Sequence, residues 1–275
     1  MNRAHRELHL PGARLRYRDD GAGRAVVFVH GWTLDLDVWD PQLALTAEMR
    51  VVRYDRRGFG LSSGIPSLHS DIDDLRALLY SLGVVSPLLV GMSQGARVVL
   101  EFAARHPGIA SGLVLDGPPP LAATGPPDKD GGADAADLPM DFFRQLAARD
   151  GLDAFRRQWS AHPLTQLLTG DARMHALLAR VLARYPGHDL TAAGAATRET
   201  LDAAMLAQVH TPALVVNGAR DSDARRRAGL ALRAALPAAE HVFIPQAGHL
   251  PNLDAPLAYN QIMSEFARRH LPAAA

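Results

Sequence analysis

A serine placed between two glycines is the feature of this sequence with the clearest chemistry. Ser93 lies in Gly91-Met92-Ser93-Gln94-Gly95, after an apolar run and before a helical pattern that begins at Gln94. Glycines two positions on either side of the serine allow a tight, strained turn from strand to helix that exposes the hydroxyl. The free N–H groups at the start of that helix can bind a developing anion. The pattern predicts a nucleophilic serine, with an ordinary helix-capping serine as the alternative.

A nucleophilic serine needs a histidine base and an acid that orients this base. His249 follows the last strand candidate of the chain, and Asp221 follows the strand candidate before it. Active sites in open α/β sheets gather at the carboxyl ends of the strands, so we expect both side chains near Ser93. The chain order serine, aspartate, histidine is also one that serine hydrolases use.

A second segment could help to stabilise negative charge on a reacting carbonyl. His30-Gly31-Trp32 follows an apolar strand candidate. The backbone N–H of Trp32 could join that of Gln94 as a hydrogen-bond donor to the oxygen. Two such donors fit acyl transfer, where the loss of one costs about 10²- to 10³-fold in rate. In the alternative, Gly31 only makes a turn and Trp32 packs in the core.

Strands and helices must hold these residues at one edge of a sheet. Apolar runs predict strands, most of them buried on both faces; they span residues 8–10, 15–18, 25–30, 51–54, 88–91, 113–116, 213–217 and 241–245. Amphipathic patterns predict helices over residues 37–48, 70–82, 94–106, 224–236 and 256–270, the second of them starting at Ser70. This alternation predicts an α/β fold with a mostly parallel central sheet flanked by helices.

The alternation stops in the middle of the chain. Residues 117–139 hold six of the 19 prolines and no strand pattern, which predicts a linker. From residue 140 to about 209, apolar residues recur only at helical spacing. We therefore expect one α/β domain, made of residues 1–117 and 206–275. An all-helical insertion over residues 118–205, entered through the proline-rich linker, interrupts it.

These motifs together resemble the serine hydrolases of the α/β-hydrolase superfamily, in particular small lidded esterases, enol-lactone hydrolases and cofactor-free perhydrolases. The residues that carry the resemblance are His30-Gly31-Trp32, Trp39, the stretch from Asp55 to Ser62, Gly91-Met92-Ser93-Gln94-Gly95, Asp221 and Gly248-His249-Leu250-Pro251. The resemblance implies Ser93 as nucleophile, His249 as base and Asp221 as its acid. It also implies backbone donors at Trp32 and Gln94, a structural loop over residues 55–62, and a lid formed by residues 118–205.

The sequence departs from this family where the acid is expected. A short turn with proline often follows the acid, but here Asp221 is followed by Ser222-Asp223-Ala224-Arg225-Arg226-Arg227. Asp223 is therefore an alternative acid. Asp116 is another, because it ends the expected strand over residues 113–116 and some relatives place the acid after that strand. We expect the three arginines to form a solvated helix face.

Substrate contacts are harder to assign, because a small helical insertion has little core of its own. Aromatic side chains of the insertion could pack in that core or face the pocket. The residues expected to contact substrate are Met92, Phe142, Phe143, Trp159 and Leu250.

Composition excludes several classes of protein. The 275 residues carry a formal net charge of zero, which gives no electrostatic reason to bind nucleic acid or an anionic membrane and agrees with an uncharged substrate. Cysteine is absent, so disulfides, thiolate metal sites and cysteine nucleophiles are excluded. No apolar run approaches the roughly 20 residues that span a bilayer, and the first residues form no apolar signal segment. We expect a cytoplasmic protein without metal or cofactor, and its oligomeric state stays open.

The sequence therefore predicts a serine hydrolase that cleaves a small-molecule carboxylic ester or lactone through an acyl-enzyme intermediate. A carbon–carbon bond hydrolase or a perhydrolase would use the same residues. A receptor that only binds a ligand in the pocket is the alternative outside catalysis.

Overall fold

The central element of the fold is a sheet of eight strands. A computed structural model describes residues 5–121, 138–191 and 201–271. The strand order is β1-β2-β4-β3-β5-β6-β7-β8. The strands are β1 (Arg6–Leu10), β2 (Ala13–Asp20), β3 (Ala25–Val29), β4 (Arg50–Tyr54), β5 (Leu88–Met92), β6 (Gly112–Asp116), β7 (Ala213–Gly218) and β8 (Ala239–Ile244). The hairpin of β1 and β2 joins β4 antiparallel, and the other strands run parallel to one another. The predicted α/β fold with a mostly parallel sheet is confirmed.

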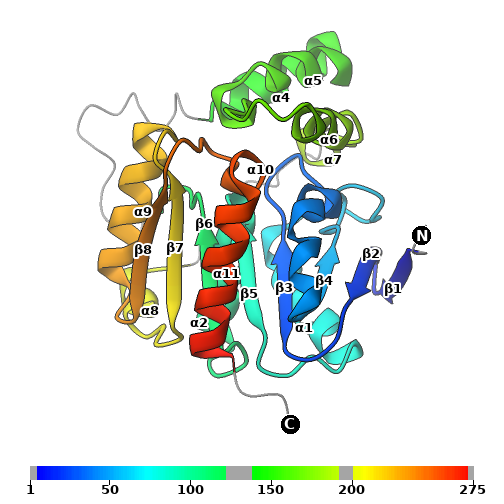
Figure 1. Ribbon diagram of the computed structural model, residues 1–275. Coiled ribbons are helices and arrows are strands. Elements are labelled where there is room, and N and C mark those ends of the chain that lie inside the picture. The colour runs from blue at the N-terminus through cyan, green and yellow to red at the C-terminus, as the bar shows by residue number, and fades with distance from the viewer. Residues whose placement is uncertain (1–4, 122–137, 192–200, 272–275) are drawn as a thin grey trace.

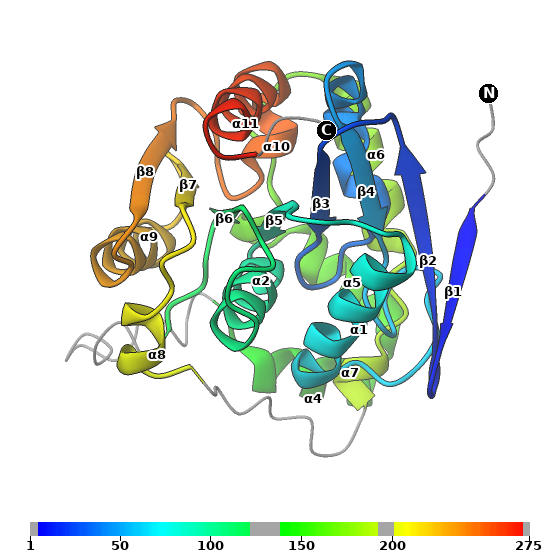
Figure 2. The same cartoon turned by 90° about the horizontal axis from the view of Figure 1, so that it is seen from below.

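Helices cover both faces of the sheet (Figure 2). One face carries α1 (Leu68–Ser81), α2 (Gln94–Arg105) and α9 (Asp223–Ala235), and the other carries η1 (Leu36–Ala47), α10 (Pro251–Asp254) and α11 (Pro256–His270). The strand β3 shows why both faces are needed: Val26 and Phe28 pack in the core beneath η1 and α11, whereas Val27 and Val29 pack beneath α1 and α2. A strand that is buried on both faces reads as an unbroken apolar run.

The structure differs from the expected elements in three local details. A helix does form where one is expected at residues 37–48, but η1 (Leu36–Ala47) is a 3₁₀ helix, and Pro41 in its interior lacks the N–H that an α-helix requires. The helix α1 begins earlier than predicted, because the Ser67 hydroxyl caps it by accepting a hydrogen bond from the amide of Ser70. The short helix α10 was not predicted.

A group of helices lies above the carboxyl ends of the strands (Figure 1). It comprises α4 (Met140–Asp150), α5 (Leu152–Ser160), η3 (Pro163–Thr165), α6 (Ala172–Ala183) and α7 (His188–Thr191). The next helix, α8 (Ala203–Ala207), packs near α9 at the other end of the sheet, and its Leu206 belongs to the core of the α/β domain. The expected boundary at residue 205 therefore falls inside α8. Much of the expected proline-rich linker, residues 122–137, lies outside the described residues.

Among the described helices, none is both long enough and apolar enough to cross a membrane.

Candidate active site

Ser93 lies in a sharp turn between β5 and α2. Its backbone has φ 52° and ψ −116°, a left-handed conformation that is strained for a residue with a Cβ atom. The flanking glycines make the turn possible. A Cβ atom on Gly91 would lie 2.2 Å from the Gly95 carbonyl oxygen, and one on Gly95 would lie 2.2 Å from the Val29 carbonyl oxygen. The chain can therefore turn here only with glycine at both positions.

His249 and Asp221 meet at the same edge of the sheet. Asp221 follows β7 and His249 follows β8, and the imidazole Nδ1 lies 2.9 Å from Asp221 Oδ2 in a buried hydrogen bond. The other carboxylate oxygen accepts the amide of Ser222 at 2.7 Å. Burial raises the pKa of Asp221, but the charge and hydrogen bond of His249, the amide of Ser222 and the charge of Arg225 together lower it below its ordinary value. An ionised carboxylate can only accept, so Nδ1 donates and Nε2 is the nitrogen that can accept a proton.

The other two candidate acids do not contact His249. Asp223 is exposed at the start of α9 and forms an ion pair with Arg226. Asp116 is fully buried at the end of β6, and burial raises its pKa well above the ordinary value. Of the three aspartates, the structure brings only Asp221 to the imidazole.

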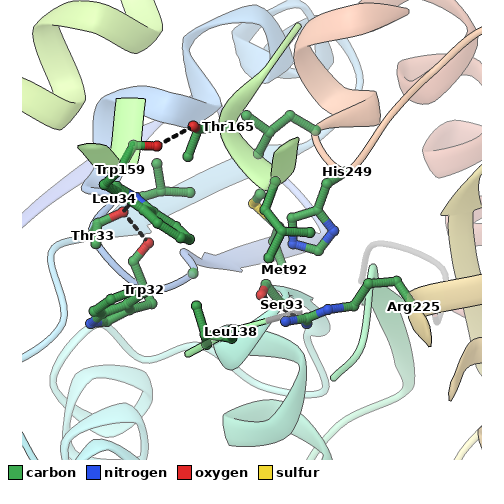
Figure 3. Close-up of a pocket in the computed structure, with 13 residues that line it drawn as sticks. Trp32, Thr33, Leu34, Met92, Ser93, Leu138, Trp159, Thr165, Arg225 and His249 are labelled. Carbon is green, nitrogen blue, oxygen red and sulfur yellow. Dashed lines mark hydrogen bonds between the residues drawn. The ribbon is translucent and has the colours of Figure 1, made fainter. Parts of the chain in front are cut away.

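Ser93 and His249 line one small cavity of about 30 Å³ (Figure 3). Among the hydrogen bonds of the described residues, none joins the Ser93 hydroxyl to His249. The hydroxyl instead accepts a long hydrogen bond, 3.4 Å, from Nη1 of Arg225. Catalytic hydrogen bonds are commonly long or misaligned in ligand-free structures and tighten when substrate binds. Ser93 and His249 therefore share a cavity in which this hydrogen bond can form when substrate binds.

Trp32 lines this cavity, and Gln94 lines a second cavity that also contacts Ser93. No hydrogen bond among the described residues uses the backbone amide nitrogen of either residue. The loop after β3 lies close to the serine, since a Cβ atom on Gly31 would be 3.3 Å from Ser93 Cβ. Helices above the sheet hold this loop: Trp159 Nε1 donates to the Thr33 hydroxyl at 2.7 Å.

The structure places the expected substrate contacts in two groups. Met92, Trp159 and Leu250 line the cavity that contains Ser93. Phe142 and Phe143 line neither cavity that we find among the described residues. Phe142 is exposed, and Phe143 packs against the rings of Trp32, Phe155 and Trp159. Phe143 thus belongs to the aromatic cluster of the helices, whereas Phe142 contacts the Phe143 ring and is itself exposed.

A larger cavity of about 320 Å³ also contacts Ser93, and arginines are prominent in its lining: Arg56, Arg97, Arg144 and Arg225. The expectation for Arg225 was wrong, because this side chain is only 2% exposed and reaches Ser93. It lies on the buried face of α9 together with Ala228 and Leu232. Helical spacing places Arg225 on that apolar stripe, so the periodicity contained a signal that the sequence analysis missed.

Comparisons with known proteins agree with the fold. Residues 24–256 match the family model of the alpha/beta hydrolase fold, and the chain therefore belongs to the α/β-hydrolase family. The members of this family act on small molecules, and the family assignment rests on most of the chain.

Three relatives illustrate the range within the family. The chain is 34% identical over 140 residues to a non-heme haloperoxidase from Rhodococcus erythropolis, a match that spans 48% of each chain. It is 28% identical over 270 residues, 93% of this chain and 95% of the other, to a Bacillus subtilis (strain 168) protein with the provisional name 2-succinyl-6-hydroxy-2,4-cyclohexadiene-1-carboxylate synthase. A thermophilic esterase from Thermogutta terrifontis has a similar structure, with a TM-score of 0.79 and 25% identity over 97% of this chain and 98% of the other. The chain thus spans about half the length of the haloperoxidase and nearly all of the other two.

Proposed function

We propose that this protein is a serine hydrolase that cleaves a carboxylic ester or a lactone through an acyl-enzyme intermediate. Ser93 is the nucleophile, His249 the base and Asp221 its acidic partner. The observation that carries the proposal is the buried hydrogen bond of 2.9 Å between His249 Nδ1 and Asp221 Oδ2, beside a serine in a strained turn. Because the carboxylate accepts from Nδ1, Nε2 is the nitrogen that can act as the base toward Ser93, which lines the same cavity as His249.

The reaction then has two halves. Ser93 Oγ attacks the carbonyl carbon while its proton moves to His249 Nε2, and the carbonyl electrons move onto the oxygen. The tetrahedral intermediate collapses, the bond to the leaving oxygen breaks, and His249 returns the proton to that alkoxide. Water then attacks the acyl carbon as His249 takes one of its protons, and Ser93 leaves with that proton.

The oxygen that becomes negative needs donors that are already in place. The amides of Trp32 and Gln94 fit this role, since they flank the serine and no other acceptor among the described residues uses them. The amide of Gln94 also lies at the amino end of α2, where the helix dipole favours negative charge.

We also propose that the helices above the sheet, within residues 118–205, form a lid over this site. Trp159 lines the cavity of Ser93 while its indole nitrogen bonds Thr33. Trp32 is tied to the same helices, because its Nε1 donates to Asp189 at 2.5 Å. The shape of the substrate pocket therefore depends on side chains of the lid as well as of the sheet.

Hydrolysis of p-nitrophenyl esters of graded chain length, beside a panel of small lactones, tests the proposal. Ser93→Ala should lower turnover by about 10⁴- to 10⁶-fold on the best substrate while the fold survives. Ser81→Ala, at an exposed serine of α1, serves as the matched control and should leave turnover unchanged. Retention of most activity by Ser93→Ala would refute the mechanism.

Peracid formation on the same residues is the second candidate function, because a relative that is 35% identical over 144 residues is named a bifunctional esterase/perhydrolase. A parallel assay with acetate and hydrogen peroxide measures this activity directly. Peracid formation faster than ester hydrolysis would assign the chain to that chemistry, whereas hydrolysis alone supports the ester or lactone assignment.

A further inference from the structure

The larger cavity beside Ser93 has an unusual charge for a site that would bind a neutral ester. Four arginines contribute to its wall, whereas Asp189 is its acidic lining residue. Asp189 already accepts hydrogen bonds from the Trp32 indole and the Tyr185 hydroxyl. The cavity wall therefore carries an excess of positive charge within reach of the nucleophile, although the whole chain has no net charge.

Arg97 is the cation in this wall that the fold leaves unsatisfied. It lies on α2, one helical turn after Ser93, and its Nε and Nη2 atoms are buried without a hydrogen-bond partner among the described residues. Buried donors of a charged group are costly when nothing accepts from them. Two other arginines of the wall are already paired, Arg56 with Asp71 and Arg144 with Asp141.

Arg225 brings a second positive charge close to the reacting atoms. It reaches over from α9, which lies on the same face of the sheet as α2 (Figure 2), and its Nη1 lies 3.4 Å from Ser93 Oγ. Figure 3 shows the guanidinium on one side of Ser93 and the imidazole of His249 on the other. Any anion that binds here lies within a few bonds of the carbonyl that Ser93 attacks.

We propose that the substrate carries a carboxylate close to its ester or lactone bond, and that Arg97, together with Arg225, binds this carboxylate. This inference rests on the proposed function and adds the class of substrate. The planar fork of a guanidinium matches a carboxylate, and charge-assisted hydrogen bonds of this kind are stronger than neutral ones. Substrates that lack the carboxylate leave the buried donors of Arg97 unpaired and therefore have a lower kcat/KM.

A matched pair of substrates separates charge recognition from general activity. 4-Nitrophenyl hydrogen succinate carries a free carboxylate, and methyl 4-nitrophenyl succinate is its neutral counterpart with the same reacting bond. The wild-type protein should show the higher kcat/KM on the anionic ester. Arg97→Met keeps the apolar stem of the side chain, and it should lower kcat/KM for the anionic ester about 10- to 100-fold while changing that for the neutral ester less than about threefold. Arg97→Lys should recover part of the loss, because it restores the charge without the fork.

The control variant is Arg227→Met, which removes an exposed arginine of α9 that does not line the cavity. It should leave the ratio between the two substrates unchanged. Equal rates of the wild-type protein on both esters, or an equal loss on both in Arg97→Met, would overturn the inference while leaving the serine hydrolase intact.

Binding of succinate, measured by calorimetry, decides the question without catalysis. Succinate should bind the wild-type protein and lose at least about tenfold in affinity in Arg97→Met, with unchanged thermal unfolding of the variant as the check on its fold. If neither ester is hydrolysed, the proposed function fails, and the succinate titration still supports or overturns the carboxylate site. Absence of succinate binding, or equal affinity in both proteins, overturns it.

Discussion

The pair formed by His249 and Asp221 depends on very local contacts. Asp221 Oδ2 holds the imidazole, and its Oδ1 is held in turn by the amide of Ser222. Gly117 leaves room for the ring, because a Cβ atom there would lie 2.9 Å from His249 Cε1. These contacts fix the imidazole in one orientation, so the identity of the acid can be tested by one substitution.

Asp221→Asn should lower kcat on an ester substrate by about 10³- to 10⁴-fold. The amide can present a donor to Nδ1 and thereby favour the wrong tautomer of His249. Asp223→Asn is the matched control two residues away, and it should change kcat less than about threefold because Asp223 contacts Arg226 at the surface. Steady-state kinetics of the two variants decide which aspartate is the acidic partner of His249. A larger loss in Asp223→Asn than in Asp221→Asn would contradict the assignment.

At the scale of residues, the sequence was informative wherever a short motif follows a strand. Ser93, Asp221 and His249 could be placed at one edge because each follows an apolar run. The role of Arg225 could not be found in the same way, since a run of three arginines looks solvated until the buried face of α9 is known. Phe142 and Phe143 are adjacent in sequence and differ in burial, and only the packing of α4 shows which of them is enclosed.

The turn from β5 to α2 is the element on which the site depends. The shape of this turn is imposed by the close approach of backbone segments. The helix α2 begins so near β3 that the Gly95 position has no space for a side chain. The register aligns Gly91 with Val29 of β3 and with Leu115 of β6, so both neighbouring strands position the turn. The strained backbone of Ser93 is thus a consequence of how α2 packs on the sheet.

Gly95→Ala should lower the free energy of unfolding by at least about 2 kcal/mol, because the new methyl group would collide with the rigid backbone of Val29. Gly170→Ala is the control, since a Cβ atom there meets nothing within 4 Å. It should change stability by less than about 0.5 kcal/mol. Chemical denaturation of both variants provides the measurement, and equal stability of the two would contradict the packing described for the turn.

The elements themselves were largely predictable, because a doubly covered parallel sheet imposes unbroken apolar runs on its strands. The errors fell where backbone hydrogen bonding decides the outcome. The stretch from residue 37 to 48 has apolar residues at helical spacing, but Pro41 lacks the N–H that an α-helix requires there, and the helix is of the 3₁₀ type. The apolar spacing alone does not distinguish the two helix types, and the signal that could have done so is the proline itself.

The whole molecule is held together across the site by polar contacts as well as by the core. Arg184, which follows α6 in the helical group, forms ion pairs with Asp35 and Asp37 in the loop and 3₁₀ helix after β3. Trp159 and Thr33 form a second link between the same two regions. The position of the helices above the sheet is therefore tied to the loop that carries the Trp32 amide.

The burial of Asp35 in this connection predicts a dependence of stability on pH. Burial, followed by the charge of Asp55, raises the pKa of Asp35 to about 7 although Arg184 opposes the shift. In the unfolded chain Asp35 ionises near its ordinary value of 3.8. Its contribution to stability is therefore greatest below about pH 4 and is lost as the pH rises toward 7. Asp35→Asn keeps an acceptor for the amide of Asp37 and removes the ionisation.

The stability of Asp35→Asn relative to the wild-type protein should consequently increase between pH 4 and pH 7, by at most about 4 kcal/mol. Urea unfolding of the two proteins across this range gives the difference directly. A relative stability that stays constant, or that falls with increasing pH, would show that Asp35 is ionised in the folded protein throughout.

The most direct test of the central claim is covalent labelling of the intact protein by a fluorophosphonate, with the modified residue identified by mass spectrometry. The probe reacts with a serine only when a neighbouring base activates the hydroxyl. We predict labelling at Ser93, loss of labelling in Ser93→Ala, and labelling slowed by at least about 10³-fold in His249→Ala. A folded protein that is not labelled, or that is labelled equally fast without His249, would contradict the assignment of Ser93 as an activated nucleophile and would favour a pocket that only binds its ligand.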